Sequence, residues 1–235
     1  MKSTVKEIQE RFDADVERFS NLYLGQQSTI DSVLNMELIA EGITRTYPKK
    51  IKLLDIGCGA GNYTIKLLTK KKDVAVDLLD LSEPMLARAV QRINSHGPTA
   101  VKAYHGDFRT VNLPGESYDV IIATSVLHHL REDADWSENF SKIFRLLADG
   151  GSLWVFDLVK QNSDELQDLI YSELYGQYLA GLDGEQYREK VFSYIEKEDT
   201  PRPLIEQLDL LRRVGFKSVD ILHKNLSFAS FVAYK

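Results

Sequence analysis

The chain has little of several features that define other protein classes. Its 235 residues include one cysteine, Cys58, which excludes an internal disulfide and any cysteine-based metal cage. No apolar run approaches the length that spans a bilayer, and no signal-peptide pattern opens the chain. We therefore expect a cytoplasmic protein without membrane attachment.

An excess of basic charge is also missing. The formal net charge is −6, from 29 Lys and Arg residues against 35 Asp and Glu residues. Lysine clusters at 49–52 and 70–72 adjoin the ends of expected elements, where they favour solubility and helix-end electrostatics over phosphate binding. A nucleic acid partner is therefore not expected. The 43% of hydrophobic residues is enough for one sizeable α/β core.

Residues 51–64 hold the pattern around which the chain is organised. An apolar run predicts a short buried strand that ends in Gly57, Gly59 and Gly61, and a helical pattern begins directly afterwards. The glycines permit a tight turn and the close approach of a ligand, while the start of the helix supplies free N–H groups. Strand, turn and helix predict the first half of a βαβ nucleotide-binding unit, with Cys58 as a small spacer.

An acidic residue before the turn argues against a dinucleotide. A Gly-x-Gly-x-x-Gly fingerprint would place a glycine where Asn62 stands. Asp55, two residues before Gly57, would repel a pyrophosphate but would suit a ligand that carries an ammonium and a sulfonium. The turn resembles the acidic-x-Gly-x-Gly-x-Gly motif of class I S-adenosylmethionine-dependent methyltransferases. The resemblance implies S-adenosylmethionine as the cofactor; a glycine turn that serves only packing is the alternative.

The following strands add cofactor candidates. A second strand over 73–81 reaches Asp80, ~20 residues beyond the turn, where a carboxylate can accept both ribose hydroxyls; a helix-entry cap is the alternative. After a third strand over 101–105, Asp107 could accept from the adenine amine with Phe108 beside the ring, or the pair could form an ordinary turn. The predicted cofactor contacts are Asp55, Gly57, Cys58, Gly59, Gly61, Asp80, Leu81, Met85, Asp107, Phe108 and Thr124.

Two adjacent histidines follow the fourth strand, which spans 118–124. The stretch from Ser125 to Leu130 again resembles small-molecule methyltransferases, and it places His128 and His129 at the carboxyl edge, where ligands bind in open α/β sheets. Adjacent helical residues point roughly 100° apart, so one of the two should face the site. We predict His128 as the catalytic residue and His129 as a substrate contact, with a structural histidine as the alternative. No metal site is predicted.

The order of the patterns predicts an α/β fold with a doubly wound, Rossmann-like sheet of seven strands. Its last strand should be antiparallel, because two closing strands have no helix between them. Residues 51–235 are expected to form this cofactor-binding domain, with a helical insertion at about 160–200, after the fifth strand. Residues 1–50 contain two helical patterns, and we predict that they form a helical lid.

Polar and aromatic groups in the lid and the insertion predict a pocket for a small-molecule acceptor. The lid contributes Tyr23 and Gln26. In the insertion, Tyr171, Tyr175 and Tyr178 share one helical face, and such a stripe is either packing or a binding surface. We predict Tyr175 as the acceptor contact among them. A homodimer is compatible with this arrangement.

A narrower resemblance suggests an alternative function. The opening Phe12-Asp13-x-x-Val16 and the closing stretch 227–233 look like carboxy-S-adenosylmethionine synthase. The resemblance implies a role in transfer RNA wobble-uridine modification, prephenate as a reactant, and an arginine in the late insertion that fixes a carboxylate. Arg188 and Arg202 are the nearby arginines, although neither matches the family's pattern. A non-catalytic cofactor-binding protein is the third hypothesis.

Overall fold

The seven-stranded sheet confirms the predicted architecture. The computed structural model describes residues 2–21 and 25–235. The strand order is β3-β2-β1-β4-β5-β7-β6, and β7 is antiparallel to both of its neighbours, whereas the other pairs are parallel. The strands are β1 (Ile51–Ile56), β2 (Val74–Asp80), β3 (Ala100–His105), β4 (Tyr118–Thr124), β5 (Leu147–Leu158), β6 (Ser218–Asn225) and β7 (Phe228–Tyr234).

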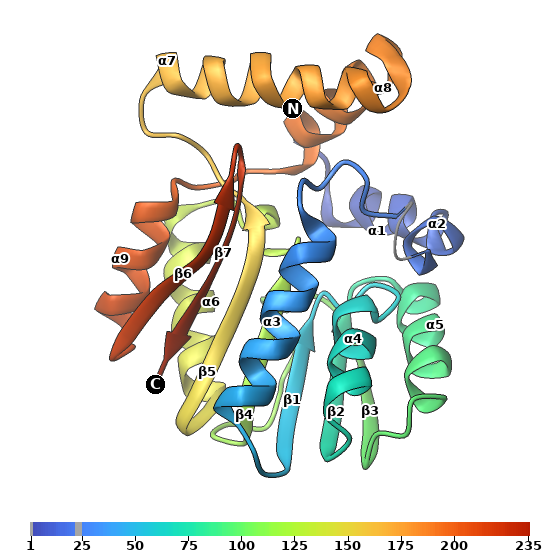
Figure 1. Ribbon diagram of the computed structural model, residues 1–235, viewed down its shortest axis with the longest axis vertical. Coiled ribbons are helices and arrows are strands. Elements are labelled where there is room, and N and C mark those ends of the chain that lie inside the picture. The colour runs from blue at the N-terminus through green and yellow to red at the C-terminus, as the bar shows by residue number, and fades with distance from the viewer. Residues whose placement is uncertain (1, 22–24) are drawn as a thin grey trace.

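Helices cover both faces of the sheet (Figure 1). Successive residues of a strand point to opposite faces, so Leu53 and Leu54 belong to two separate apolar cores. One core packs under α3 (Ser32–Thr46), α4 (Asn62–Lys70) and α5 (Glu83–Asn94), and the other under α6 (Asp133–Leu146) and α9 (Leu204–Val214). The sheet is therefore buried on both faces, as its apolar strands predict.

The remaining helices lie at the carboxyl end of the parallel strands (Figure 1). They are α1 (Val5–Asp13), α2 (Val16–Ser20), the short η1 (Leu127–His129), α7 (Asp164–Gln167), the π-helical segment Asp168–Tyr175 and α8 (Gly176–Glu198). Arg11 of α1 forms a bidentate ion pair with the buried Glu198 of α8, with Nη2 2.6 Å from Oε2. The N-terminal helices and the insertion are thus joined to each other above the sheet.

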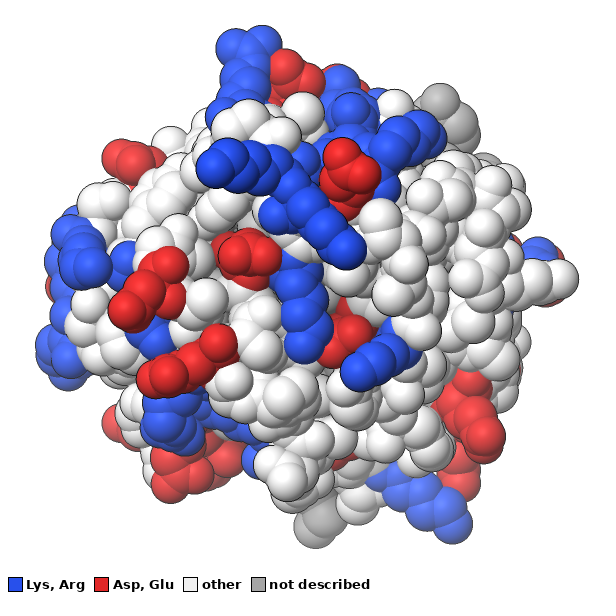
Figure 2. All heavy atoms as spheres, turned by 90° about the horizontal axis from the view of Figure 1, so that it is seen from below, with Lys and Arg blue, Asp and Glu red and all other residues white. Residues whose placement is uncertain are grey.

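The surface carries charges of both signs. Figure 2 shows the end of the molecule opposite the insertion, where basic side chains are interspersed with acidic ones. Within the described part of the chain, no helix is both long and apolar enough to cross a membrane.

Candidate functional site

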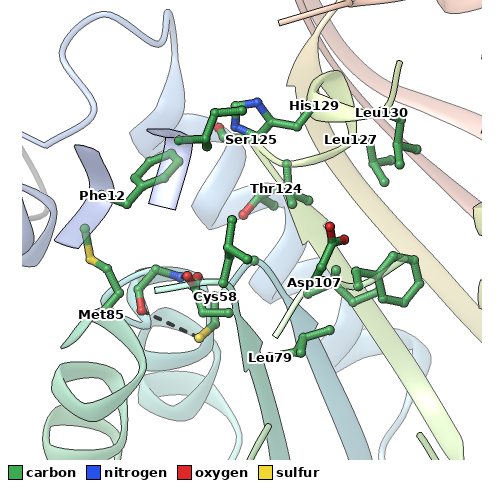
Figure 3. Close-up of a pocket in the computed structure, with 18 of the residues that line it drawn as sticks. Phe12, Cys58, Leu79, Met85, Asp107, Thr124, Ser125, Leu127, His129 and Leu130 are labelled. Carbon is green, nitrogen blue, oxygen red and sulfur yellow. Dashed lines mark hydrogen bonds between the residues drawn. The ribbon is translucent and has the colours of Figure 1, made fainter. Parts of the chain in front are cut away.

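A cavity of about 470 Å³ lies between the carboxyl ends of the strands and the N-terminal helices. Its floor comes from the glycine turn, the end of β2 and the residues after β3 and β4. Its roof includes Ile8 and Phe12 of α1 and Phe19 of α2. Phe12 and His129 lie across the cavity from Cys58 and Met85 (Figure 3). Sequence reasoning missed the roof residues, although their helical spacing marked one face of each helix.

The glycine turn opens one backbone position to the cavity. Gly59 has φ +49°, and a Cβ built on it would meet no heavy atom within 4 Å, so the space beside this backbone is free for a ligand. Gly57 and Cys58 also line the cavity. Gly61 does not: its φ is +82°, and an added Cβ would lie 2.9 Å from Cδ1 of Ile93 in α5. Its role is therefore the close packing of α4 against α5.

The Cys58 side chain is an inert part of this turn. Its backbone N–H donates to the carbonyl of Leu79 at 3.0 Å, which ties the turn to β2. Burial raises the pKa of the Cys58 thiol well above its usual value, so the neutral thiol is favoured. This agrees with its interpretation as a small spacer.

Two carboxylates lie beside the turn. Asp80 accepts from the N–H of Gly59 at 2.7 Å and from that of Ser82 at 2.8 Å, and burial raises its pKa. Each oxygen has a second lone pair, so Asp80 can still accept from a ligand. Asp55 is 1% exposed; one oxygen accepts from the Thr64 hydroxyl at 2.6 Å, and the other has no partner among the described residues. Burial first, and then the charge of Asp80, raise the pKa of Asp55 to about 7.

The predicted adenine contacts also line the cavity, together with Leu81, Met85 and Thr124. The Asp107 carboxylate is already engaged by the Arg109 guanidinium, with Nε 3.0 Å from each oxygen. Burial opposes its charge, but Arg109 outweighs this and lowers the pKa of Asp107. Sequence reasoning did not anticipate that a ligand would share Asp107 with Arg109.

One of the two histidines lines the cavity, and it is His129. His128 does not line it: Nδ1 pairs with Asp157, and Nε2 lies 3.7 Å from Oδ1 of Asp199. Burial opposes a charge on His128, but the two carboxylates outweigh it and raise its pKa to about 9. Nδ1 of His129 lies 3.2 Å from the same Asp199 oxygen. Asp157 ends β5, so the strand-end argument that selected Asp80 could also have found it.

The predicted acceptor contacts are divided. Gln26 lines the cavity, and its side-chain oxygen is buried without a hydrogen-bond partner in the described parts of the chain. Tyr175 does not line it: its ring packs against Phe228, with the centroids 5.4 Å apart, and its hydroxyl donates to the carbonyl of Ser28 at 2.8 Å. Tyr23 lies outside the described residues.

The region that forms this floor matches a known family. Residues 53–151, from β1 into β5, match the family described as a methyltransferase domain. The chain is a class I S-adenosylmethionine-dependent methyltransferase. The cofactor of this methyltransferase is S-adenosylmethionine, and the free space beside Gly59 and the remaining acceptor capacity of Asp80 fit a ligand with ribose hydroxyls.

Several known proteins are similar to the methyltransferase. A carboxy-S-adenosyl-L-methionine synthase of Campylobacter lari is 26% identical over 86% of this chain and 84% of its own length. A malonyl-[acyl-carrier protein] O-methyltransferase of a Paenibacillus species is 27% identical over 82% of this chain and 68% of its own. The structure of human N-acetylserotonin methyltransferase shares the fold, with a TM-score of 0.66 and 19% identity; the similarity covers 99% of this chain and 59% of that one.

Proposed function

We propose that the cavity binds S-adenosylmethionine together with a small-molecule acceptor, and that the protein transfers a methyl group between them. The observation that carries the proposal is that several residues that line the cavity have buried polar atoms without hydrogen-bond partners among the described residues. These atoms are Oδ1 of Asp55, the Tyr63 hydroxyl, Oε1 of Gln26 and both ring nitrogens of His129. Buried polar groups in folded proteins are nearly always paired, so these residues are candidates to form hydrogen bonds with polar ligands.

The cofactor half lies at the glycine turn. We assign the ribose hydroxyls to Asp80 and the adenine to Asp107 and Phe108, as their positions at the end of β2 and after β3 suggest. Asp55, with its pKa of about 7, would ionise readily beside a cationic ligand. These residues bind and orient the cofactor, which supplies an already activated methyl group.

The acceptor half lies under α1, beside His129 and Gln26. The Phe12 ring packs edge-on against His129, with the centroids 6.0 Å apart, and closes this side of the cavity. These residues would hold the acceptor in line with the methyl group and exclude water. We therefore assign the acceptor contact to His129, because His128 does not line the cavity and its Nδ1 is paired with Asp157.

A second candidate function is the synthesis of carboxy-S-adenosylmethionine. The similarity to the Campylobacter lari synthase along most of both chains supports it. The arginines considered for its carboxylate do not line the cavity: Arg188 pairs with Glu185, and Arg202 pairs with Asp133. We therefore favour methyl transfer over carboxy-S-adenosylmethionine synthesis. We also favour it over cofactor binding without turnover, because His129 and Gln26 provide polar groups for an acceptor beyond the cofactor half.

The experiment uses the purified protein with methyl-labelled S-adenosylmethionine and small-molecule acceptors pooled by functional group. Methyl transfer predicts a labelled acceptor and an equal amount of S-adenosylhomocysteine, both detected by mass spectrometry. A carboxylated cofactor formed on addition of prephenate would instead support the second candidate. Cofactor binding without turnover in any pool would support the third hypothesis.

The proposal also covers partners and location. A small molecule is favoured over a nucleic acid because the net charge of the chain is −6. Cytoplasmic location, the homodimer and the lid role of residues 1–50 stay predictions. Cell fractionation, sedimentation and removal of the N-terminal helices would test them in turn.

A further inference from the structure

Three potential metal ligands converge where η1 meets the end of α8. His128, His129 and Asp199 each offer one ligand atom, and these atoms all lie within 4.8 Å of one another. The Asp199 side chain is 4% exposed, and its Oδ1 has no hydrogen-bond partner within the described residues. Neither ring nitrogen of His129 has one either. A buried, unpaired carboxylate oxygen beside unpaired imidazole nitrogens requires an explanation.

The spacing of these atoms is also compatible with a bound cation. Oδ1 of Asp199 lies 3.7 Å from Nε2 of His128, which is too far for a hydrogen bond, and 3.2 Å from Nδ1 of His129. Two ligands about 2.1 Å from a tetrahedral ion are about 3.4 Å apart. The two observed distances lie on either side of that value.

The surroundings also match those of a metal site. Asp157 binds Nδ1 of His128, which leaves Nε2 as the nitrogen directed at Asp199. A carboxylate behind a histidine commonly orients a metal ligand in this way. Arg11 is the nearby arginine, but its guanidinium is taken by Glu198. Two buried carboxylates and two imidazoles therefore share this pocket. His128, with its pKa raised to about 9, would release a proton when a cation binds to its Nε2.

We propose that His128, His129 and Asp199 bind a divalent transition-metal ion. Two imidazoles and one carboxylate form a donor set that suits Zn²⁺, Co²⁺ or Fe²⁺. Three protein ligands leave at least one coordination position for water or another ligand. Because His129 lines the cavity, the ion would lie next to the acceptor half of the site.

The test is a titration of the chelator-stripped full-length protein with Co²⁺, followed by the visible absorption of the bound ion. The wild type should bind one equivalent, and Zn²⁺ should displace it. His129→Gln and Asp199→Asn should each weaken binding by more than about 100-fold, because the loss of a group that merely orients a ligand already costs about 10- to 100-fold. His223→Gln is the matched control, since His223 also pairs with a carboxylate, Asp31, at 2.8 Å.

Thermal unfolding provides a second measurement on the same proteins. Zn²⁺ should raise the melting temperature of the wild type and of His223→Gln, and leave that of His129→Gln and Asp199→Asn unchanged. The proposal would be overturned if the wild type showed no saturable Co²⁺ binding, or if all four proteins bound Co²⁺ equally. The His128, His129 and Asp199 side chains would then be paired through protons instead of a metal ion. S-adenosylhomocysteine is also titrated into the stripped protein. Its binding there would support the cofactor site whether or not Co²⁺ binds, so the two proposals are tested separately.

Discussion

Replacement of Gly59 by leucine should block cofactor binding without unfolding the protein. An added Cβ meets no protein atom within 4 Å, so the larger side chain would enter the cavity instead of the core. At φ +49° a residue other than glycine costs roughly 1–2 kcal/mol of stability. Separately from this loss of stability, the leucine side chain should crowd the ligand and cost about 1–3 kcal/mol of binding free energy, which is about 5- to 150-fold in affinity.

Gly97→Leu is a matched control for this change. Gly97 also has a positive φ, +71°, and open space around its Cβ position, but it lies in the turn after α5, away from the cavity. Denaturant unfolding should therefore show similar losses of stability in the two variants. Calorimetric titration with S-adenosylhomocysteine should show weak binding only for Gly59→Leu. Equal affinities in the two variants would refute the placement of the cofactor at this turn.

Three further changes test other parts of the site. Asp80→Asn should weaken S-adenosylhomocysteine binding about 5- to 150-fold, from 1–3 kcal/mol for a lost charged acceptor, and wild-type affinity by calorimetry would contradict the ribose assignment. The raised pKa of Asp55 means that its carboxylate lowers stability as the pH rises from about 4 through 7. Asp55→Asn should therefore remove this loss of stability. In the wild type, cofactor affinity should rise about fivefold from pH 6 to 7 as Asp55 ionises, and Asp55→Asn should lose this rise; parallel affinity curves for the two proteins would refute this role. Tyr175→Phe removes the hydrogen bond to Ser28 and should cost about 1 kcal/mol in denaturant unfolding with unchanged turnover, whereas a selective loss of turnover would restore Tyr175 as an acceptor contact.

The sheet and the cofactor floor were predictable because their signals are local. Apolar runs define the strands, and the residues that follow a parallel strand must meet at one edge of the sheet. Asp55, Gly59 and Asp80 were found in this way, and all three line the cavity.

Contacts between distant segments determine which residues of the roof and the acceptor side face the cavity, and local patterns alone do not determine these contacts. His128 lies outside the cavity lining because Asp157, from β5, holds its Nδ1, whereas the adjacent His129 lines the cavity. Tyr175 is buried because Phe228, from β7, packs against its ring. Arg109 takes the Asp107 carboxylate through its own side-chain conformation, which sequence spacing does not determine.

A crystal structure with S-adenosylhomocysteine tests the central claim most directly. The account predicts the ribose hydroxyls within hydrogen-bond distance of Asp80, the ligand backbone against Gly59, and the sulfur directed toward the side of the cavity that holds His129. A ligand bound elsewhere, or in the cavity with its ribose away from Asp80, would contradict the account.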